Sequence, residues 1–176
     1  MIDSSSSRVL AIRPFCRGFG FVLLEGPRFL LDWGVREAAR TGKNCICRSK
    51  IDILIQHYQP DCLLVEDTTA TGCRRCPRVR HLLRSTISSA RRKQLRVATL
   101  SLAQVKAAFA SEQAITRHDR ARVIARYLPE LLGRMPPKRK PWMSDDSRLS
   151  IFDAAALALT FYTHEQRRRV RSPRAQ

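Results

Sequence analysis

The strongest constraint on the fold is a short apolar run at residues 62–65 that ends in a carboxylate, Glu66. A run of strand length without polar alternation is typical of a strand that is covered on both faces of an α/β sheet. Ligand and catalytic groups gather at the carboxyl ends of such strands. Glu66 is therefore a candidate site residue, although a lone carboxylate in this place also fits the start of a solvated loop.

The remaining elements predict an α/β fold with one mixed sheet. Apolar stretches bounded by turn residues predict strands at residues 8–12, 18–24, 28–33, 62–65 and 94–100. Helical spacing of apolar residues predicts helices within 35–58 and over 77–92, 101–109, 118–132 and 144–164. The first three strands form an antiparallel meander, and right-handed crossovers bring the other two beside strand one. We expect a five-stranded sheet of order 3-2-1-4-5, with strand two antiparallel and helices on both faces.

The chain length of 176 residues fits one domain with a substantial core. We place this domain at residues 8–165. A Ser-rich segment at residues 1–7 precedes it and is predicted to be flexible. Residues 166–176 contain five arginines and are predicted to be a flexible basic tail.

The chain carries a large excess of positive charge. Thirty-three Lys and Arg residues oppose fifteen Asp and Glu residues, which gives a formal net charge of +18. This imbalance indicates a polyanionic partner, and nucleic acid is the best match. Candidate contacts with the phosphate backbone are Arg17, Arg74, Arg75, Arg78, Lys106, Lys138, Arg139 and Lys140. A protein that only coats nucleic acid would have the same charge, so composition identifies a partner and no reaction.

Residues 135–142 form a basic, proline-rich connector that cannot be helical. Trp142 ends this connector. We expect its ring to pack beneath the last helix, and stacking on an unpaired base is the alternative.

The sequence contains no segment that predicts a membrane location. No apolar run approaches the ~20 residues that span a bilayer. Residues 1–7 also lack the basic flank and the apolar segment of a signal peptide. We therefore expect a cytoplasmic protein, associated with the nucleoid if its source is prokaryotic, whose six cysteines are reduced.

The cysteines suggest a zinc site only weakly. Cys73 and Cys76 have the spacing of half a site, and His81 is nearby. Cys45 and Cys47 are separated by a single residue within a predicted helix, which is the wrong spacing for the other half. We expect reduced thiols without a bound metal.

Five short motifs extend over most of the chain. They are Val9-Leu-Ala-Ile-Arg-Pro14, Arg17-Gly-Phe-Gly-Phe21, Leu63-Leu-Val-Glu66, Val105-Lys106 and Asp153-Ala-Ala-Ala-Leu-Ala-Leu159. In order and spacing they resemble the RNase H-like superfamily and, within it, the RuvC-type Holliday-junction resolvases. The resemblance implies an endonuclease that hydrolyses phosphodiester bonds in branched or structured DNA, commonly as a homodimer. It also implies Mg²⁺ or Mn²⁺ held by acids at strand and helix ends.

The same resemblance assigns roles to individual acids. Glu66 matches the fourth-strand Glu and Asp153 matches an Asp of the last helix, so both are implied metal ligands and catalytic residues. Asp146 is a third catalytic candidate, although it lies two helical turns before Asp153, roughly 10 Å along a helix. That separation is too large for both to hold one ion, and a charge at the helix start is the competing interpretation.

The sequence departs from the family pattern at the first-strand acid, where Arg13 stands in place of an Asp. A guanidinium at this position repels a dication and can instead form bidentate bonds with Glu66 or Asp153. Asp153 lies in an apolar run, where an unpaired carboxylate is costly, so we expect either a cation or Arg13 as its partner. Two hypotheses follow: a metal-dependent endonuclease, or an inactive nucleic-acid-binding module in which Arg13 replaces the metal. A basic protein that binds RNA or a ribonucleoprotein is a more distant third.

Overall fold

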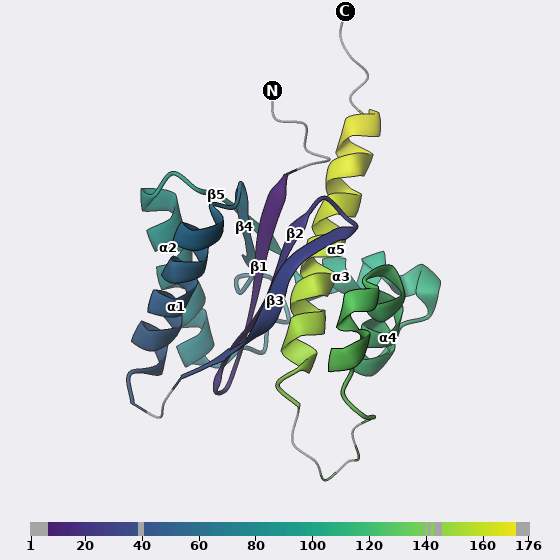
Figure 1. The fold of residues 1–176 in the computed structure, drawn as a ribbon, viewed down its shortest axis with the longest axis horizontal. Helices are drawn as coiled ribbons and strands as arrows, with labels where there is room; N and C mark the ends of the chain where they lie inside the picture. The colour runs from purple at the N-terminus through teal and green to yellow at the C-terminus, as the bar shows by residue number, and fades with distance from the viewer. Residues whose placement is uncertain (1–6, 39–40, 139, 141, 143–145, 172–176) are drawn as a thin grey trace, which may run out of the picture.

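The computed structural model describes residues 7–38, 41–138, 140, 142 and 146–171. Five strands form one sheet in the order β3-β2-β1-β4-β5 (Figure 1). They are β1 (Arg8–Phe15), β2 (Gly18–Glu25), β3 (Phe29–Glu37), β4 (Cys62–Glu66) and β5 (Arg96–Leu100). Strand β2 is antiparallel to β1 and β3, whereas β4 is parallel to β1 and β5. The predicted mixed sheet and its order are confirmed, and β1 lies beside the strand that ends at Glu66.

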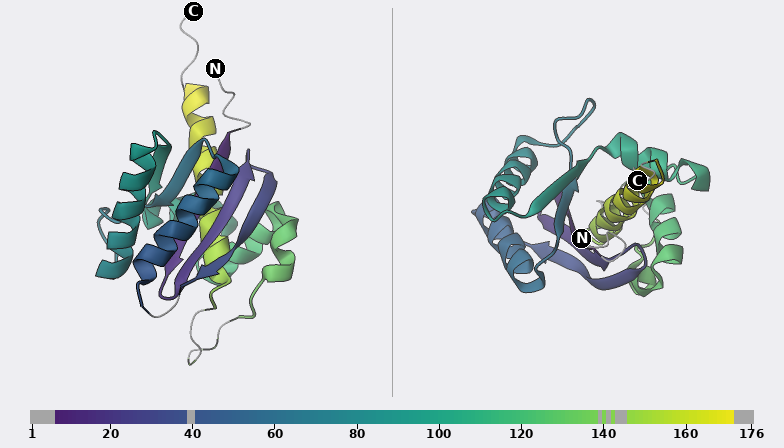
Figure 2. Two further views of the ribbon diagram at one scale, coloured as in Figure 1. Left: turned by 60° about the vertical axis from the view of Figure 1, so that its left-hand side comes forward. Right: turned by 90° about the horizontal axis from the view of Figure 1, so that it is seen from above.

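Helices cover both faces of the sheet (Figure 2). They are α1 (Lys43–Tyr58), α2 (Pro77–Arg92), α3 (Leu102–Ala108), α4 (Arg117–Tyr127) and α5 (Leu149–Arg171), with 3-10 turns at Ala110–Glu112 and Pro129–Arg134. Helices α1 and α2 cover one face, and α5 covers the other, with α3 and α4 beside it. Each face has its own apolar core, which explains why β1 and β4 are apolar on both sides.

Strand β1 is longer than predicted because it continues through Pro14 to Phe15. A proline inside a central strand is normally excluded, since it has no N–H to donate. Here β4 pairs with β1 only as far as Ile12, so Pro14 pairs with β2 alone, opposite Phe19. The extension carries Arg13 beyond the last paired residue of β4.

Other predicted ends are also wrong. Strand β3 extends to Glu37, because Val35 pairs with Gly20 on β2, and α1 begins at Lys43, within the range predicted for it. The helix predicted to end at residue 132 ends at Tyr127, since Pro129 begins a 3-10 turn. The range of α2, in contrast, is the predicted one.

The first and last residues of the final helix, α5, also differ from the prediction. It begins at Leu149, because Asp146 accepts a hydrogen bond from the Arg148 backbone N–H in a turn that precedes the helix. The cap predicted at residue 144 lies outside the described residues. The helix continues past the end predicted near His164 to Arg171, and Glu165 ties this last part to Arg96 on β5 at 2.9 Å.

Gly20 allows α5 to approach β2 closely. A Cβ atom at this position would lie 2.5 Å from the carbonyl carbon of Ser150 in the first turn of α5. Only the absence of a side chain on β2 permits this contact. The close approach positions the N-terminal half of α5, which carries Asp153, against the centre of the sheet.

Candidate functional site

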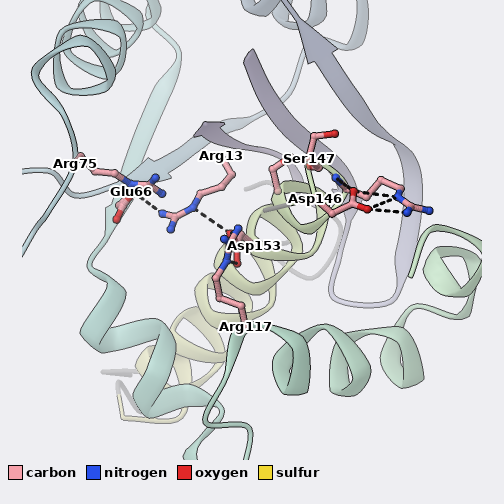
Figure 3. Close-up of polar contacts among 9 residues, drawn as sticks. Arg13, Glu66, Arg75, Arg117, Asp146, Ser147 and Asp153 are labelled. Carbon is pink, nitrogen blue, oxygen red and sulfur yellow. Dashed lines mark hydrogen bonds and ion pairs between the residues drawn. The ribbon is translucent and has the colours of Figure 1, made fainter. Parts of the chain in front are cut away.

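The candidate site lies where β1, β4 and α5 meet, and it contains Arg13, Glu66 and Asp153 (Figure 3). Side chains alternate along a strand, and Val9 and Ala11 on β1 face the α5 side of the sheet. Arg13 therefore faces the same side, as does Glu66 at the end of β4 after Cys62 and Leu64. Asp153 points at them from the second turn of α5.

Arg13 lies between the two carboxylates. Its Nη1 forms a short ion pair with Oε2 of Glu66, and its Nε lies 3.5 Å from Oδ2 of Asp153. Only 12%, 5% and 12% of the side chains of Arg13, Glu66 and Asp153 are exposed. Burial lowers the pKa of the Arg13 guanidinium, and the attraction of Asp153 opposes this shift. An arginine nevertheless stays charged at neutral pH, so one buried cation joins the two acids.

Two further arginines complete the coordination of the acids. Arg75, in the loop before α2, places Nε 2.6 Å from the same Oε2 of Glu66. Arg117, the first residue of α4, places Nη2 2.6 Å from Oδ2 of Asp153 and Nε 3.4 Å from Oδ1. We call Arg13, Arg75, Arg117, Glu66 and Asp153 the arginine–carboxylate cluster. It holds three positive and two negative charges.

A fourth arginine adds to the positive charge beside the cluster. Arg120 is buried, lies with Arg13 and Asp153 around one small hollow, and donates to the Ile115 carbonyl at 3.2 Å. Burial lowers its pKa, and Asp153 opposes this effect. The side of the cluster nearest α4 is therefore more positive than the ion pairs alone indicate.

These side chains do not fit a Mg²⁺ site. Mg²⁺ requires near-octahedral oxygen ligands at about 2.0–2.1 Å, whereas the cluster already engages both oxygens of Asp153 and Oε2 of Glu66 with guanidinium groups. Within the described ranges, no three His, Cys, Asp or Glu side chains are arranged to hold a metal ion. The two carboxylates are bonded to guanidinium groups, and the excess positive charge of the three arginines repels a dication.

Asp146 is not part of the cluster. Its carboxylate instead forms an ion pair with Arg148 at 2.7 Å and also accepts the Arg148 backbone N–H at 2.9 Å (Figure 3). The side-chain hydrogen bond from Arg148 lowers the pKa of Asp146. The geometry favours the competing interpretation of this residue, a charge that organises the start of the last helix.

The predicted phosphate contacts divide into two groups. Arg75 and Arg78 are used inside the protein: Arg75 binds Glu66, and Arg78 donates to Asn44 and to the carbonyls of Phe15 and Cys16, which fastens the β1–β2 hairpin to α1. The exposed ones are Arg17, Arg74, Lys106, Lys138 and Lys140. Arg139 lies outside the described residues.

A hollow opens beside the cluster, between the loop after β4 and the start of α3. Its lining includes Arg13, Glu66, Arg74, Arg75, Ser101 and Lys106. The Ser101 side chain accepts from the Gln104 backbone N–H at 3.2 Å, so the predicted cap of α3 is confirmed. The hollow offers Arg74 and Lys106 to solvent next to the buried acids.

Sequence analysis did not identify two residues of the site, Arg117 and Arg120. Their positions follow from a capping box, in which Thr116 and Asp119 exchange hydrogen bonds and fix the start of α4. The Thr-x-x-Asp pattern is readable in the sequence and predicts the helix start. It does not predict that α4 packs on α5 and points Arg117 at Asp153.

Trp142 does not pack beneath the last helix, which corrects the prediction. Its side chain is 78% exposed, and Nζ of Lys140 lies 5.5 Å from the ring centroid. The alternative, stacking on a base, stays a prediction.

All six cysteines are free thiols, of which Cys47 and Cys62 are buried. None of the helices described is long and apolar enough to cross a membrane.

Comparison with known proteins identifies the fold. No protein-family model matches the chain, and neither does any curated protein. Solved structures do match. One is Thermus thermophilus RuvC in complex with a Holliday junction substrate, which has a TM-score of 0.66 and 16% sequence identity. The match covers 91% of this chain and 96% of the RuvC chain. The structure of Thermus thermophilus RuvC has a TM-score of 0.64 and 19% sequence identity, and the match covers 90% of this chain and 96% of that chain. The yeast mitochondrial Holliday junction resolvase Ydc2 has a TM-score of 0.65 and 14% sequence identity, and the match covers 93% of this chain and 81% of that chain. The protein therefore has the RuvC type of RNase H-like fold.

Proposed function

We propose that this protein binds branched or structured DNA and does not cleave it by a metal-dependent reaction. The observation that carries the proposal is the position of Arg13, whose guanidinium lies between Glu66 and Asp153 where a metal ion would need their oxygens. Of the two hypotheses formed from the sequence, this geometry favours the inactive binding module over the endonuclease.

The charge of the cluster supports an anionic partner. Three guanidinium groups and two carboxylates leave an excess of one positive charge, before Arg120 is counted. A dication would add two charges of the same sign in a partly desolvated place, where repulsion is strong. A backbone phosphate brings the opposite charge, and the exposed Arg74 and Lys106 beside the cluster are suited to meet it.

The choice of DNA rests on the fold and the total charge. The net charge of +18 favours a nucleic acid over a small anion. The fold is shared with a RuvC structure in complex with a Holliday junction substrate and with a structure named as a Holliday junction resolvase. A homodimer belongs to this proposal, because a four-way junction has arms related by symmetry and a two-fold assembly matches them.

The competing function is a Mg²⁺- or Mn²⁺-dependent endonuclease. One observation favours it: Glu66 and Asp153 contact the same arginine, so two acids of the kind that hold catalytic metal lie in one place. For this function Arg13, Arg75 and Arg117 would all have to withdraw from the acids before a metal could bind. We therefore rank it second.

A binding and cleavage assay separates the two functions. Purified protein is incubated with labelled four-way junction DNA, with linear duplex of the same sequence as a control, in Mg²⁺, Mn²⁺ or EDTA. We expect salt-dependent binding that is unchanged by EDTA, and no cleavage. Cleavage that requires Mg²⁺ and disappears in both Glu66→Gln and Asp153→Asn would establish the endonuclease instead.

The variant Arg13→Asp tests the replacement directly, because it restores the acid that the family pattern has at this position. We expect it to gain Mg²⁺ binding by calorimetry, because three acids then outnumber Arg75 and Arg117 and the metal can displace these two arginines. The wild type and the charge-neutral variant Arg13→Gln should show no Mg²⁺ binding. Tight Mg²⁺ binding by the wild type would contradict the proposal.

A further inference from the structure

The outward face of α2 carries a row of arginines. At 3.6 residues per turn, Arg80, Arg84 and Arg91 lie within about 40° of one another around the helix axis. All three are exposed. The buried residues of α2 lie on the opposite side and are Val79, Leu82, Leu83, Thr86, Ser89 and Ala90. We call Arg80, Arg84 and Arg91 the α2 stripe.

Nothing in the described part of the chain neutralises the α2 stripe. Helix α2 contains no Asp or Glu. Asp52 on α1, which accepts a hydrogen bond from Ser89 of α2, is paired with Lys93 at 2.6 Å. The Arg80 side chain donates to the carbonyl of Cys73 at 3.0 Å, and the side chains of Arg84 and Arg91 form no ion pair or hydrogen bond with another described residue. Arg80 and Arg84 are four residues apart, a spacing at which like charges repel each other, and no acid of the described structure offsets this repulsion.

We propose that the α2 stripe is a second nucleic-acid surface that binds the phosphate backbone of a double-stranded arm. It lies outside the hollow beside the cluster, which we call the cleft. The inference rests on the proposed function, because it extends the same DNA beyond the arginine–carboxylate cluster. From Arg80 to Arg91 the row extends roughly 16 Å along the helix axis. That length spans several successive phosphates of one strand, which follow each other at about 3.4 Å along a duplex axis.

The chemistry of α2 selects a duplex over other partners. Surfaces for single strands combine basic residues with aromatic rings that stack on bases, and α2 contains no Phe, Tyr or Trp. A second copy of the chain would bring the same positive row, and like charges across an interface oppose association. The partner is therefore a polyanion that is contacted through its backbone and without sequence preference.

The α2 stripe begins where the cleft ends. Arg74 and Arg75 line the hollow beside the cluster, and α2 starts at Pro77, directly after this loop. Figure 3 shows Arg75 approaching Glu66 from this loop. A duplex arm that leaves the cleft over Arg74 meets Arg80 first and then Arg84 and Arg91. The protein thereby contacts a branch point and one of its arms together.

The test measures DNA affinity as a function of salt for two matched triple variants. The stripe variant is Arg80→Gln, Arg84→Gln, Arg91→Gln. The control is Arg122→Gln, Arg126→Gln, Arg134→Gln, which removes the same charge from exposed arginines around α4. Arg122 and Arg126 line a hollow together with the acids Glu112 and Asp119, so their charge is locally balanced. Affinity for a four-way junction with long arms is measured by fluorescence anisotropy at several salt concentrations.

Each phosphate contact contributes about 0.9 to the slope of log affinity against log salt. We expect the stripe variant to lose between about 2 and 3 from the slope, which is on the order of 100-fold in affinity near 0.15 M salt. The control keeps the wild-type slope, and the single variant Arg84→Gln loses about 0.9. Junctions with arms trimmed to a few base pairs should reduce the difference between wild type and stripe variant.

Three results would overturn the inference or its basis, and they are distinguishable. Equal slopes for the stripe variant and the control overturn the inference while leaving DNA binding by the cleft intact. A stripe variant that binds junctions normally but loses binding to anionic lipid vesicles overturns it in favour of a membrane partner. A wild type that binds no DNA at any salt concentration refutes the proposed function itself.

Discussion

Arginine has two different roles in this molecule, and pairing with acids separates them. In the arginine–carboxylate cluster, Arg13, Arg75 and Arg117 each pair with an acid, and the acids are at most 12% exposed. In the α2 stripe, Arg84 and Arg91 face solvent without an acid on their helix. Each arginine of the cluster has an acid as partner, whereas no acid pairs with the arginines of the stripe in the described structure.

This difference teaches how to interpret a basic sequence. A buried guanidinium must have a partner, because an isolated charge out of water is very costly. Partly buried arginines are also bonded within the fold, as Arg75 and Arg78 are, and both were predicted to contact phosphate. An exposed arginine without an acid remains available to a polyanion. Exposure and pairing therefore predict phosphate contacts better than local density of charge.

The largest expected effect is on the stability of the cluster. Arg13→Met leaves two poorly exposed carboxylates with one cation fewer between them, and breaking a buried ion pair in this way costs about 3 kcal/mol. Arg8→Met is the matched control on the same strand, since Arg8 pairs with Glu25 at 3.1 Å with 47% of its side chain exposed. It should cost under about 1 kcal/mol. Urea unfolding measures both, and equal losses would erase the distinction between buried and exposed arginines.

The second effect concerns the packing that brings Asp153 to Arg13. In Gly20→Ala the new Cβ would lie 2.5 Å from the Ser150 carbonyl carbon, so α5 must shift away from β2. We expect a loss of about 2 kcal/mol in the free energy of unfolding, as for other overpacked cores. Gly133→Ala is the control, because its Cβ would meet no atom within 4 Å. Thermal unfolding that treats both variants alike would contradict the close approach.

The third effect extends the comparison to a buried thiol. Burial raises the pKa of Cys62 to about 11, from an ordinary value of 9.0. The unfolded chain therefore releases this proton first, so the stabilising contribution is complete below pH 9 and is lost as the pH rises toward 11. Between pH 8 and pH 10 the wild type should lose about 1 kcal/mol more than Cys62→Ala. Burial is the largest cause of the raised pKa of Tyr162 and is present in both proteins, and the charge of Cys62 adds a smaller part. Parallel pH profiles would show that Cys62 ionises normally in the fold.

The smallest effect is on the stability of the α2 stripe. Arg84→Gln removes an exposed charge without a partner, so the free energy of unfolding should change by less than about 0.5 kcal/mol. The sign should favour the variant, because a repulsion within the row is removed. Calorimetric unfolding at low salt measures the change. A loss above 1 kcal/mol would reveal a structural role for Arg84 and weaken the contrast with the cluster.

Much of the fold could be predicted because its signals are local. An apolar run without alternation predicted that β4 is covered on both faces, and the order of elements predicted the sheet. Element ends were less predictable. Pro14 continues β1 only because β4 stops pairing at Ile12, and Glu165 holds the end of α5 through Arg96. The pairing of β1 with β4 and the bond between Arg96 and Glu165 each join two different elements of the fold.

The site was predicted in part for the same reason. Motifs singled out Arg13, Glu66 and Asp153, and the structure brings them into contact. Asp146 was named from its spacing to Asp153, but this spacing has meaning only inside a helix, and the helix starts at Leu149. Arg117 was missed, since its bond to Asp153 joins residues 36 positions apart on two helices.

The sequence by itself determined the layered sheet, the amphipathic α2 with its row of arginines and the total charge. Each of these follows from the period of a strand or a helix, which is a property of neighbouring residues. Only the tertiary structure decided which arginines are paired and which are open to a partner. The reason is that ion pairs form between whichever side chains packing brings together, as for Arg13 and Glu66, which are 53 residues apart.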